Sequence, residues 1–94
     1  MENRISGKNI VVFSEEQWNR FAHRWGLTKR ETEVTRLVCQ GWNYKQIARG
    51  LGISYHTVTT LVWRVYKRMH VHDRVGIMIQ LLMHYGVIEK EENK

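Results

Sequence analysis

The amino-acid sequence predicts an all-α fold, and two features of the chain carry that prediction. Polar residues suited to helix capping stand before apolar positions spaced three or four residues apart, as in amphipathic helices. Glycines follow these stretches where a helix can end in a left-handed residue. With 94 residues, 43% of them hydrophobic, and no proline, the composition is that of one small folded domain.

The first expected helix begins at Ser14, where S-E-E-Q forms a capping box with Gln17 as its second partner. Gly26 supplies the left-handed stop. Before this helix, residues 1–9 are expected to form a loose arm and residues 10–13 a short extended piece. The apolar positions of the helix fall on one face and are interpreted as packing residues: Trp18, Phe21, Ala22 and Trp25.

Two further helices are expected before residue 53. A second capping box, T-K-R-E, starts one at Thr28, and Gly41 ends it; its buried stripe is Val34, Leu37 and Val38. Asn43 caps a shorter helix that breaks at Gly52 and buries Ile47, Ala48 and Leu51. The small Ala48 allows a close helix approach, and the G-I-S turn after it has the length that sets two helices at a steep angle.

Ser54 caps the next expected helix, which covers residues 54–69. One face carries the apolar stripe of Val58, Val62, Val65 and Met69. The opposite face carries Thr59, Thr60, Trp63, Arg64 and Lys67. The sequence thus predicts one buried face and one polar, basic face on the same helix.

The last helix is expected to run from Arg74, after the cap Asp73, to about Tyr85, near Gly86. It is apolar around most of its circumference, which is more than a terminal helix of a small domain buries internally. The surplus residues are expected to meet another surface, as a dimer interface would provide: Val75, Ile79 and Met83.

Positive charge is concentrated in the middle of the chain. Residues 28–74 hold nine Lys and Arg against three Asp and Glu, whereas the rest of the chain holds six of each. A basic segment between neutral or acidic ends is typical of nucleic-acid binding, although a basic surface that serves solubility is also compatible with it.

Several classes of site and location are disfavoured by the sequence. His70 and His72 beside Asp73 offer too few ligands for a metal site, and no set of residues resembles a catalytic site or a cofactor site. The single Cys39 and the lack of a long apolar run predict a cytoplasmic protein that is neither disulfide-bonded nor membrane-spanning. We therefore expect a non-enzymatic protein without a cofactor.

Five stretches of the sequence together resemble the LuxR/GerE family of helix-turn-helix domains. They are L-T-K-R-E-T-E-V (27–34), G-W-N-Y-K-Q-I-A (41–48), L-G-I-S (51–54), T-V (57–58) and V-H-D-R (71–74). The resemblance covers about residues 27–88. It implies a four-helix DNA-binding domain of bacterial transcription regulators, here with an additional N-terminal helix in residues 1–26 and a charged tail in residues 89–94.

The resemblance also implies roles for individual residues. The helix over residues 54–69 would lie in the major groove of duplex DNA, and the last helix would form a homodimer. Expected phosphate contacts are Thr28, Asn43, Lys45, Thr57, Lys67 and Arg68. Expected base-edge contacts are Val58, Thr59, Thr60, Trp63 and Arg64.

The chain departs from the family on the surface that would read bases. The family commonly has Lys or Arg at the position of Thr59, a histidine at Leu61 and a small or polar residue at Trp63. Without guanidinium or amide groups at 59 and 60, bidentate base contacts are lost there, and reading would rest on hydroxyls, on threonine contacts with thymine methyls and on Arg64.

A rival interpretation follows from the same departures. A helix-turn-helix fold of this kind could have exchanged DNA reading for a protein partner, bound through Trp63, Leu61 and the two N-terminal tryptophans. The sequence also leaves three forms of the protein open: a standalone regulator, one controlled by a partner, or a fragment of a longer chain. It does not place the N-terminal helix, which could cover the last helix, extend the dimer interface or block it.

Overall fold

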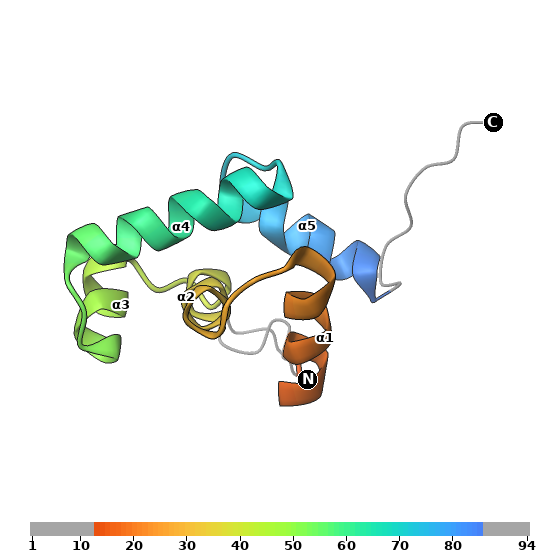
Figure 1. The fold of residues 1–94 in the computed structure, drawn as a ribbon, viewed down its shortest axis with the longest axis horizontal. Coiled ribbons are helices and arrows are strands. Elements are labelled where there is room, and N and C mark those ends of the chain that lie inside the picture. The colour runs from red at the N-terminus through yellow and green to blue at the C-terminus, as the bar shows by residue number, and fades with distance from the viewer. Residues whose placement is uncertain (1–12, 86–94) are drawn as a thin grey trace, which may run out of the picture.

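Five α-helices make up the part of the chain described by the structure, residues 13–85 of a computed structural model. In chain order they are α1 (Glu15–Trp25), α2 (Lys29–Cys39), α3 (Tyr44–Leu51), α4 (Tyr55–Met69) and α5 (Arg74–His84). No strand occurs among these residues, and the predicted all-α fold class is confirmed. α4 crosses α2, with α3 near its first half and α5 near its second (Figure 1). Most of the predicted extended piece, and Gly86, fall outside the described residues.

Each helix begins after the polar residue predicted to cap it. The side chains that accept a hydrogen bond from a backbone N–H in the first turn belong to Ser14, Thr28, Asn43, Ser54 and Asp73. In the first three, the side chain three residues on also bonds back to the N–H of the cap residue, which completes a capping box. Since the caps satisfy amides that have no partner within the helix, short stretches of sequence set the helix starts.

Three of the helices end in a left-handed residue, and glycine provides it in two of them. Gly26 after α1 and Gly52 after α3 have φ angles of 68° and 69°, which place them in the left-handed region. α4 ends instead at His70, a non-glycine residue at φ 58° whose N–H donates to the carbonyl of Lys67 at 3.2 Å. The turns at Gly26 and Gly52 lead directly into the caps of α2 and α4.

The buried residues form two cores, which share α4. The α2–α3–α4 core consists of Val34, Val38, Ile47, Val58, Leu61 and Val62. The α1–α4–α5 core consists of Trp18, Phe21, Val65, Met69, Ile77 and Leu81. Tyr66 packs against both. One face of α4 is therefore buried along its whole length, as its apolar stripe predicted.

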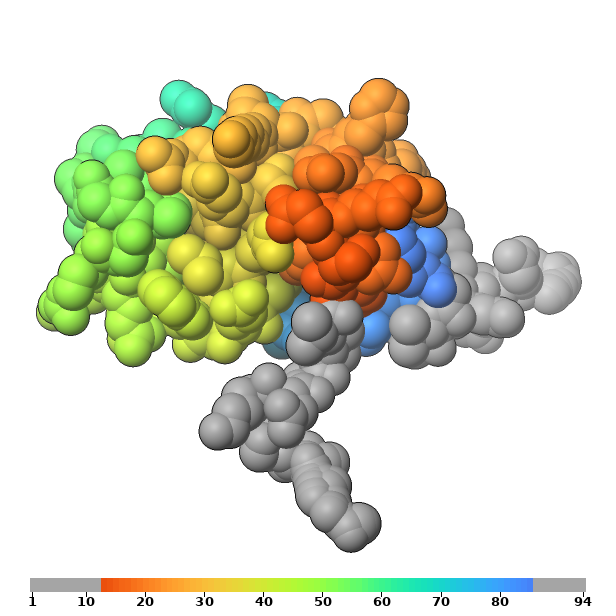
Figure 2. All heavy atoms as spheres, turned by 90° about the horizontal axis from the view of Figure 1, so that it is seen from below, coloured from red at the N-terminus to blue at the C-terminus, as the bar shows by residue number. Residues whose placement is uncertain are grey.

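The structure places the N-terminal helix, which the sequence left open. α1 packs against α5 through the α1–α4–α5 core, and the Tyr85 hydroxyl donates to the Gln17 carbonyl. An ion pair of 2.8 Å between Glu15 and Arg36 joins α1 to α2. Seen from below, α1 lies between α2 and α5 (Figure 2). α1 is thus part of the folded body and covers one side of α5.

Candidate nucleic-acid interface

α3 and α4 form a helix-turn-helix unit. After Gly52, the N–H of Ile53 donates to the Ala48 carbonyl at 3.0 Å, which closes the turn against the end of α3. Ile47 in α3 and Val58 in α4 are both 0% exposed and pack in the α2–α3–α4 core. This packing holds one face of α4 against the body and leaves the opposite face in solvent.

The solvent face of α4 brings together four of the residues predicted to read bases. Thr59, Thr60 and Trp63 line a shallow, open hollow of about 310 Å³. The Trp63 side chain is 59% exposed, and Lys67 Nζ lies 4.8 Å from the centroid of its ring. Arg64, the next residue, is also exposed. An apolar surface therefore lies between cationic side chains on one helix face.

Two other residues of α4 do not lie on this face, and their assignments are corrected. Val58, predicted to contact a base edge, is 0% exposed and forms part of the core, as its place in the apolar stripe also predicted. Leu61, which the rival interpretation placed on a protein-binding surface, is 8% exposed and lies in the same core. Val58 therefore cannot contact an external molecule while the domain is folded, and Leu61 has little surface left for such a contact.

Of the predicted phosphate contacts at helix N-termini, three have uncharged side chains. Thr28 and Asn43 cap α2 and α3, and Thr57 lies in the first turn of α4, where its hydroxyl is 2.8 Å from that of Ser54. All three residues are exposed. Helix N-termini favour anions because their first backbone N–H groups lack partners within the helix and carry the positive end of the helix dipole.

The two predicted phosphate-binding lysines are exposed as well. Lys45 lies in the first turn of α3 and Lys67 in the last turn of α4. Within residues 13–85, neither ammonium group is paired with a carboxylate. Both charges are therefore available to an external anion.

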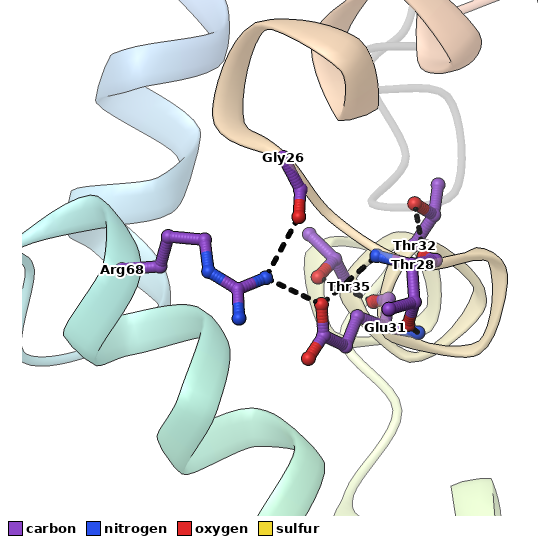
Figure 3. A network of polar contacts seen from close by, with 6 residues as sticks. All are labelled: Gly26, Thr28, Glu31, Thr32, Thr35 and Arg68. Atoms are coloured by element: carbon purple, nitrogen blue, oxygen red, sulfur yellow. Dashed lines mark hydrogen bonds and ion pairs between the residues drawn. The ribbon is translucent and has the colours of Figure 1, made fainter.

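Arg68 makes contacts within the domain that the sequence did not predict. Its Nη1 donates to the Gly26 carbonyl at 2.9 Å and to Glu31 Oε1 at 2.7 Å (Figure 3). The Glu31 side chain is 3% exposed, and the same oxygen accepts the Thr28 N–H at 2.9 Å. Arg68 thus compensates a buried carboxylate and connects the end of α1, the start of α2 and α4.

The sequence shows only that Arg68 does not lie opposite the apolar stripe of α4. Arg68 directly precedes the buried Met69 and follows the buried Val65 by three positions, so it flanks the apolar stripe and does not oppose it. Sequence reasoning also did not select Tyr55, which is 52% exposed in the first turn of α4, with its ring 6.1 Å from that of Tyr44. Tyr55 extends the candidate interface towards α3.

α5 exposes part of its apolar surface on the side not covered by the core. Val75 and Ile79 are 57% and 42% exposed, and Met83 is half-buried. These residues recur every four positions, so they share one side of the helix. Within the chain, the predicted dimerisation residues Val75 and Ile79 are thus exposed, and Met83 is partly buried.

Among the described residues, the side chains of Cys39 and Tyr66 have clearly raised pKa values. Burial raises the pKa of the Cys39 thiol to about 12, which keeps it protonated and weakly nucleophilic at neutral pH. Burial, together with the neighbouring Tyr44, raises the pKa of Tyr66 to about 12. Between residues 13 and 85, no three of the His, Cys, Asp and Glu side chains are grouped to hold a metal ion. None of the helices described has the length and apolar character needed to cross a membrane.

Residues 26–81 match a known protein family, described as "Bacterial regulatory proteins, luxR family". The chain belongs to this family. The predicted family is thereby confirmed, and membership makes the chain a domain of the transcription-regulator class. The match begins after α1, so this helix lies outside the part of the chain that the family describes.

Named relatives include longer regulators from several bacteria. The transcriptional regulatory protein LiaR of Bacillus subtilis strain 168 is 31% identical over 74 residues, which are 79% of this chain and 35% of LiaR. The nitrate/nitrite response regulator protein NarP of Escherichia coli strain K12 is 33% identical over 93 residues, 88% of this chain and 43% of NarP. The chain spans less than half the length of these relatives. No solved structure matches it.

Proposed function

We propose that this chain binds duplex DNA sequence-specifically as a homodimer, with α4 of each protomer in a major groove, and regulates transcription in the bacterial cytoplasm. The observation that carries the proposal is the solvent face of α4. It presents Thr59, Thr60, Trp63 and Arg64 on a helix whose opposite face is anchored in both cores. A helix held in this way can enter the major groove without leaving the domain.

The charge around the helix-turn-helix unit supports a polyanionic partner. No Asp or Glu occurs between Glu33 and Asp73, while six cationic residues do: Arg36, Lys45, Arg49, Arg64, Lys67 and Arg68. Lys45 and Lys67 hold exposed charges at the ends of α3 and α4. Such a surface displaces counterions from DNA and favours association with phosphates.

The two kinds of contact come from different parts of the unit. The proposed base-edge contacts are Thr59, Thr60, Trp63 and Arg64, all on the solvent face of α4. The proposed phosphate contacts are Thr28, Asn43, Lys45, Thr57 and Lys67, of which all but Lys67 lie at helix N-termini. This division gives the domain its register on the duplex from phosphates and its specificity from α4.

Exposed apolar residues on α5 support the homodimer. Val75 and Ile79 are exposed on α5, and Met83 lies on the same side of this helix. Two copies related by a two-fold axis would bury these residues against the same residues of the other copy. The two α4 helices would then address half-sites about one helical turn of DNA apart, roughly 10 base pairs.

Affinity selection from random duplexes at near-physiological salt tests the proposal directly. We expect enrichment of a motif with two-fold symmetry and the half-site spacing given above. The double variant R64E/K67E should lose roughly ten- to hundredfold in affinity for the enriched duplex, because it reverses two charges at the interface. Arg24→Glu is the control: it reverses an exposed charge on α1, outside the proposed interface, and should have little effect. Failure to enrich any duplex contradicts the proposal.

The dimer has its own test. Ile79→Glu places a charge in the proposed α5 interface and should convert the protein to a monomer in sedimentation experiments. Binding to the full site should fall towards that of a single half-site. If Ile79→Glu leaves both the mass in solution and the affinity unchanged, the dimer does not form through α5.

One observation favours the rival function, a protein-interaction module. Trp63 is 59% exposed, and exposed tryptophans are frequent at protein interfaces. For such a module, R64E/K67E would leave partner binding largely intact, while Trp63→Ala would abolish it. Because Leu61 is buried, it adds little to the apolar surface that such a module could use.

A further inference from the structure

We propose that Thr59, Thr60 and Trp63 recognise thymine through its 5-methyl group, so that each preferred half-site carries thymines opposite the middle of α4. This inference rests on the proposed binding of duplex DNA by α4. It adds the chemical feature that the helix reads, namely a methyl group in the major groove and not a pattern of hydrogen-bond donors and acceptors.

The three residues share one hollow and have few free polar groups to offer it. Together they line the open depression of about 310 Å³ on the solvent face of α4. The Thr59 hydroxyl donates to the His56 carbonyl at 2.8 Å, so its hydrogen is already used by the helix backbone. The methyl group of Thr59 and the acceptor lone pairs of its hydroxyl oxygen are left free, so this side chain has no donor to offer. None of the three side chains has the paired donors or acceptors that distinguish guanine or adenine.

Trp63 supplies the largest apolar surface of the hollow, and Lys67 helps to hold it in place. The Lys67 ammonium, 4.8 Å from the ring centroid, is attracted to the indole face. In this arrangement a cation suited to a phosphate lies directly beside a flat apolar surface. In the major groove the base edge that matches such a surface is thymine, because only its edge carries a methyl group. Cytosine would present an amino group there, which the indole face cannot accept as well as water does.

The surroundings of the hollow favour DNA over a protein as its occupant. Arg64 and Lys67 flank it, and the sequence contains no carboxylate between Glu33 and Asp73. Apart from Tyr55, Trp63 is the only large apolar residue of α4 that is exposed. A stable protein interface buries about 800 Å² on each partner, which an isolated indole cannot supply. A small apolar surface among cations fits a methyl group beside a phosphate backbone.

The test replaces thymidine by deoxyuridine, which removes only the 5-methyl group. In the duplex enriched by selection, each thymidine is replaced in turn and the dissociation constant is measured at fixed salt. At one or two positions in each half-site we expect a loss of about fourfold, the factor for withdrawing one methylene-sized group from an apolar contact. Replacement in both half-sites should give about the square of that loss.

Protein variants assign the effect to these residues. With Trp63→Ala, the thymine and uracil duplexes should bind with nearly equal affinity. Thr59→Ser and Thr60→Ser remove one methyl each and keep the hydroxyl, and at least one of them should reduce the uracil penalty. Arg64→Ala is the matched control on the same helix face: it should weaken binding but retain the penalty. Trp63 is exposed and alanine favours helices, so circular dichroism of Trp63→Ala should be unchanged.

Each outcome separates this inference from the proposed function. Specific binding without a uracil effect at any position would overturn methyl recognition and leave DNA binding intact. A uracil penalty that persists in Trp63→Ala and in both serine variants would overturn its assignment to the hollow. If no duplex is enriched, both proposals fail, and the exposed indole is then explained by a protein partner.

Discussion

The two cores of this protein differ in composition and in their relation to the family. The α2–α3–α4 core contains only Val, Ile and Leu and positions the helix-turn-helix unit. The α1–α4–α5 core adds Trp18 and Phe21 from a helix that precedes the family match at residues 26–81. Since α4 passes through both, the helix proposed to read DNA depends on packing contributed by α1. α1 is therefore an integral part of the fold, although the family match does not include it.

Removal of the Phe21 ring from the α1–α4–α5 core should have the largest effect on stability. Phe21 is 0% exposed, and Phe21→Ala should reduce the free energy of unfolding by about 3–5 kcal/mol through lost burial and the cavity left behind. Urea denaturation followed by circular dichroism measures this. We expect a single transition, because α4 couples the two cores. Two separate transitions, or a loss below about 1 kcal/mol, would show that α1 contributes little to the rest of the fold.

The next largest effect on stability is expected at Arg68, which joins α4 to the end of α1 and the start of α2 through Gly26 and Glu31. Arg68→Ala leaves the buried Glu31 carboxylate without its cation and should cost about 1.5–3 kcal/mol, the range for hydrogen bonds to charged groups. The neighbouring Lys67→Ala removes an exposed charge and should change stability by less than about 0.5 kcal/mol. Comparable losses from both substitutions in thermal or urea unfolding would contradict the structural role of Arg68.

Substitution of two helical glycines by alanine should change stability less, and the two changes should differ. A Cβ added at Gly76 in α5 would lie 2.6 Å from Val71 Cβ, an atom fixed to the backbone, so Gly76→Ala should cost about 1–2 kcal/mol despite its better helix propensity. At Gly50 in α3, the nearest atom is the edge of the Trp42 ring at 2.8 Å, and that exposed side chain can move. Gly50→Ala should be neutral or slightly stabilising. Equal thermal shifts in the two variants would refute this distinction.

At neutral pH the smallest effect is expected from the Cys39 thiol, which changes stability only above pH 9.0. Burial raises its pKa from the usual 9.0 to about 12, so above pH 9.0 the unfolded chain loses this proton while the folded chain keeps it. The contribution to stability is therefore complete below pH 9.0 and is lost as pH rises towards 12. In urea unfolding, Cys39→Ala should show a shallower decline above pH 9.0 than the unmodified protein. Parallel declines in the two proteins would mean that the thiol does not contribute.

Local sequence was sufficient for the helices and for much of the candidate site. The five caps and the glycine stops at 26 and 52 depend on residues within one turn of each other, and the structure has them as predicted. The placement of Thr59, Thr60, Trp63 and Arg64 on the face opposite the apolar stripe was predicted as well, since a helical period assigns faces without knowledge of the partner helices.

One prediction was wrong and one contact was missed, both at residues whose partners the resemblance and the helical period left undefined. Val58 received a base-contact role from the resemblance although its own spacing placed it in the buried stripe, and it is fully buried. Arg68 is separated from Glu31 by 37 positions and from Gly26 by 42, so no local pattern could reveal that its guanidinium binds them. A cation on the flank of an apolar stripe can point either to solvent or to a buried acceptor, and only the packing of α4 on α2 selects between them.

By itself, the sequence determined an all-α domain, its capped helices, its family and a basic surface on the helix after Ser54. These properties follow from interactions between residues close in the chain and from the total of charges. The packing of the helices, in contrast, places α1 over one side of α5 and sets Arg68 against a buried carboxylate. These features depend on how helices distant in sequence pack together, and periodicity along a single helix does not contain that information.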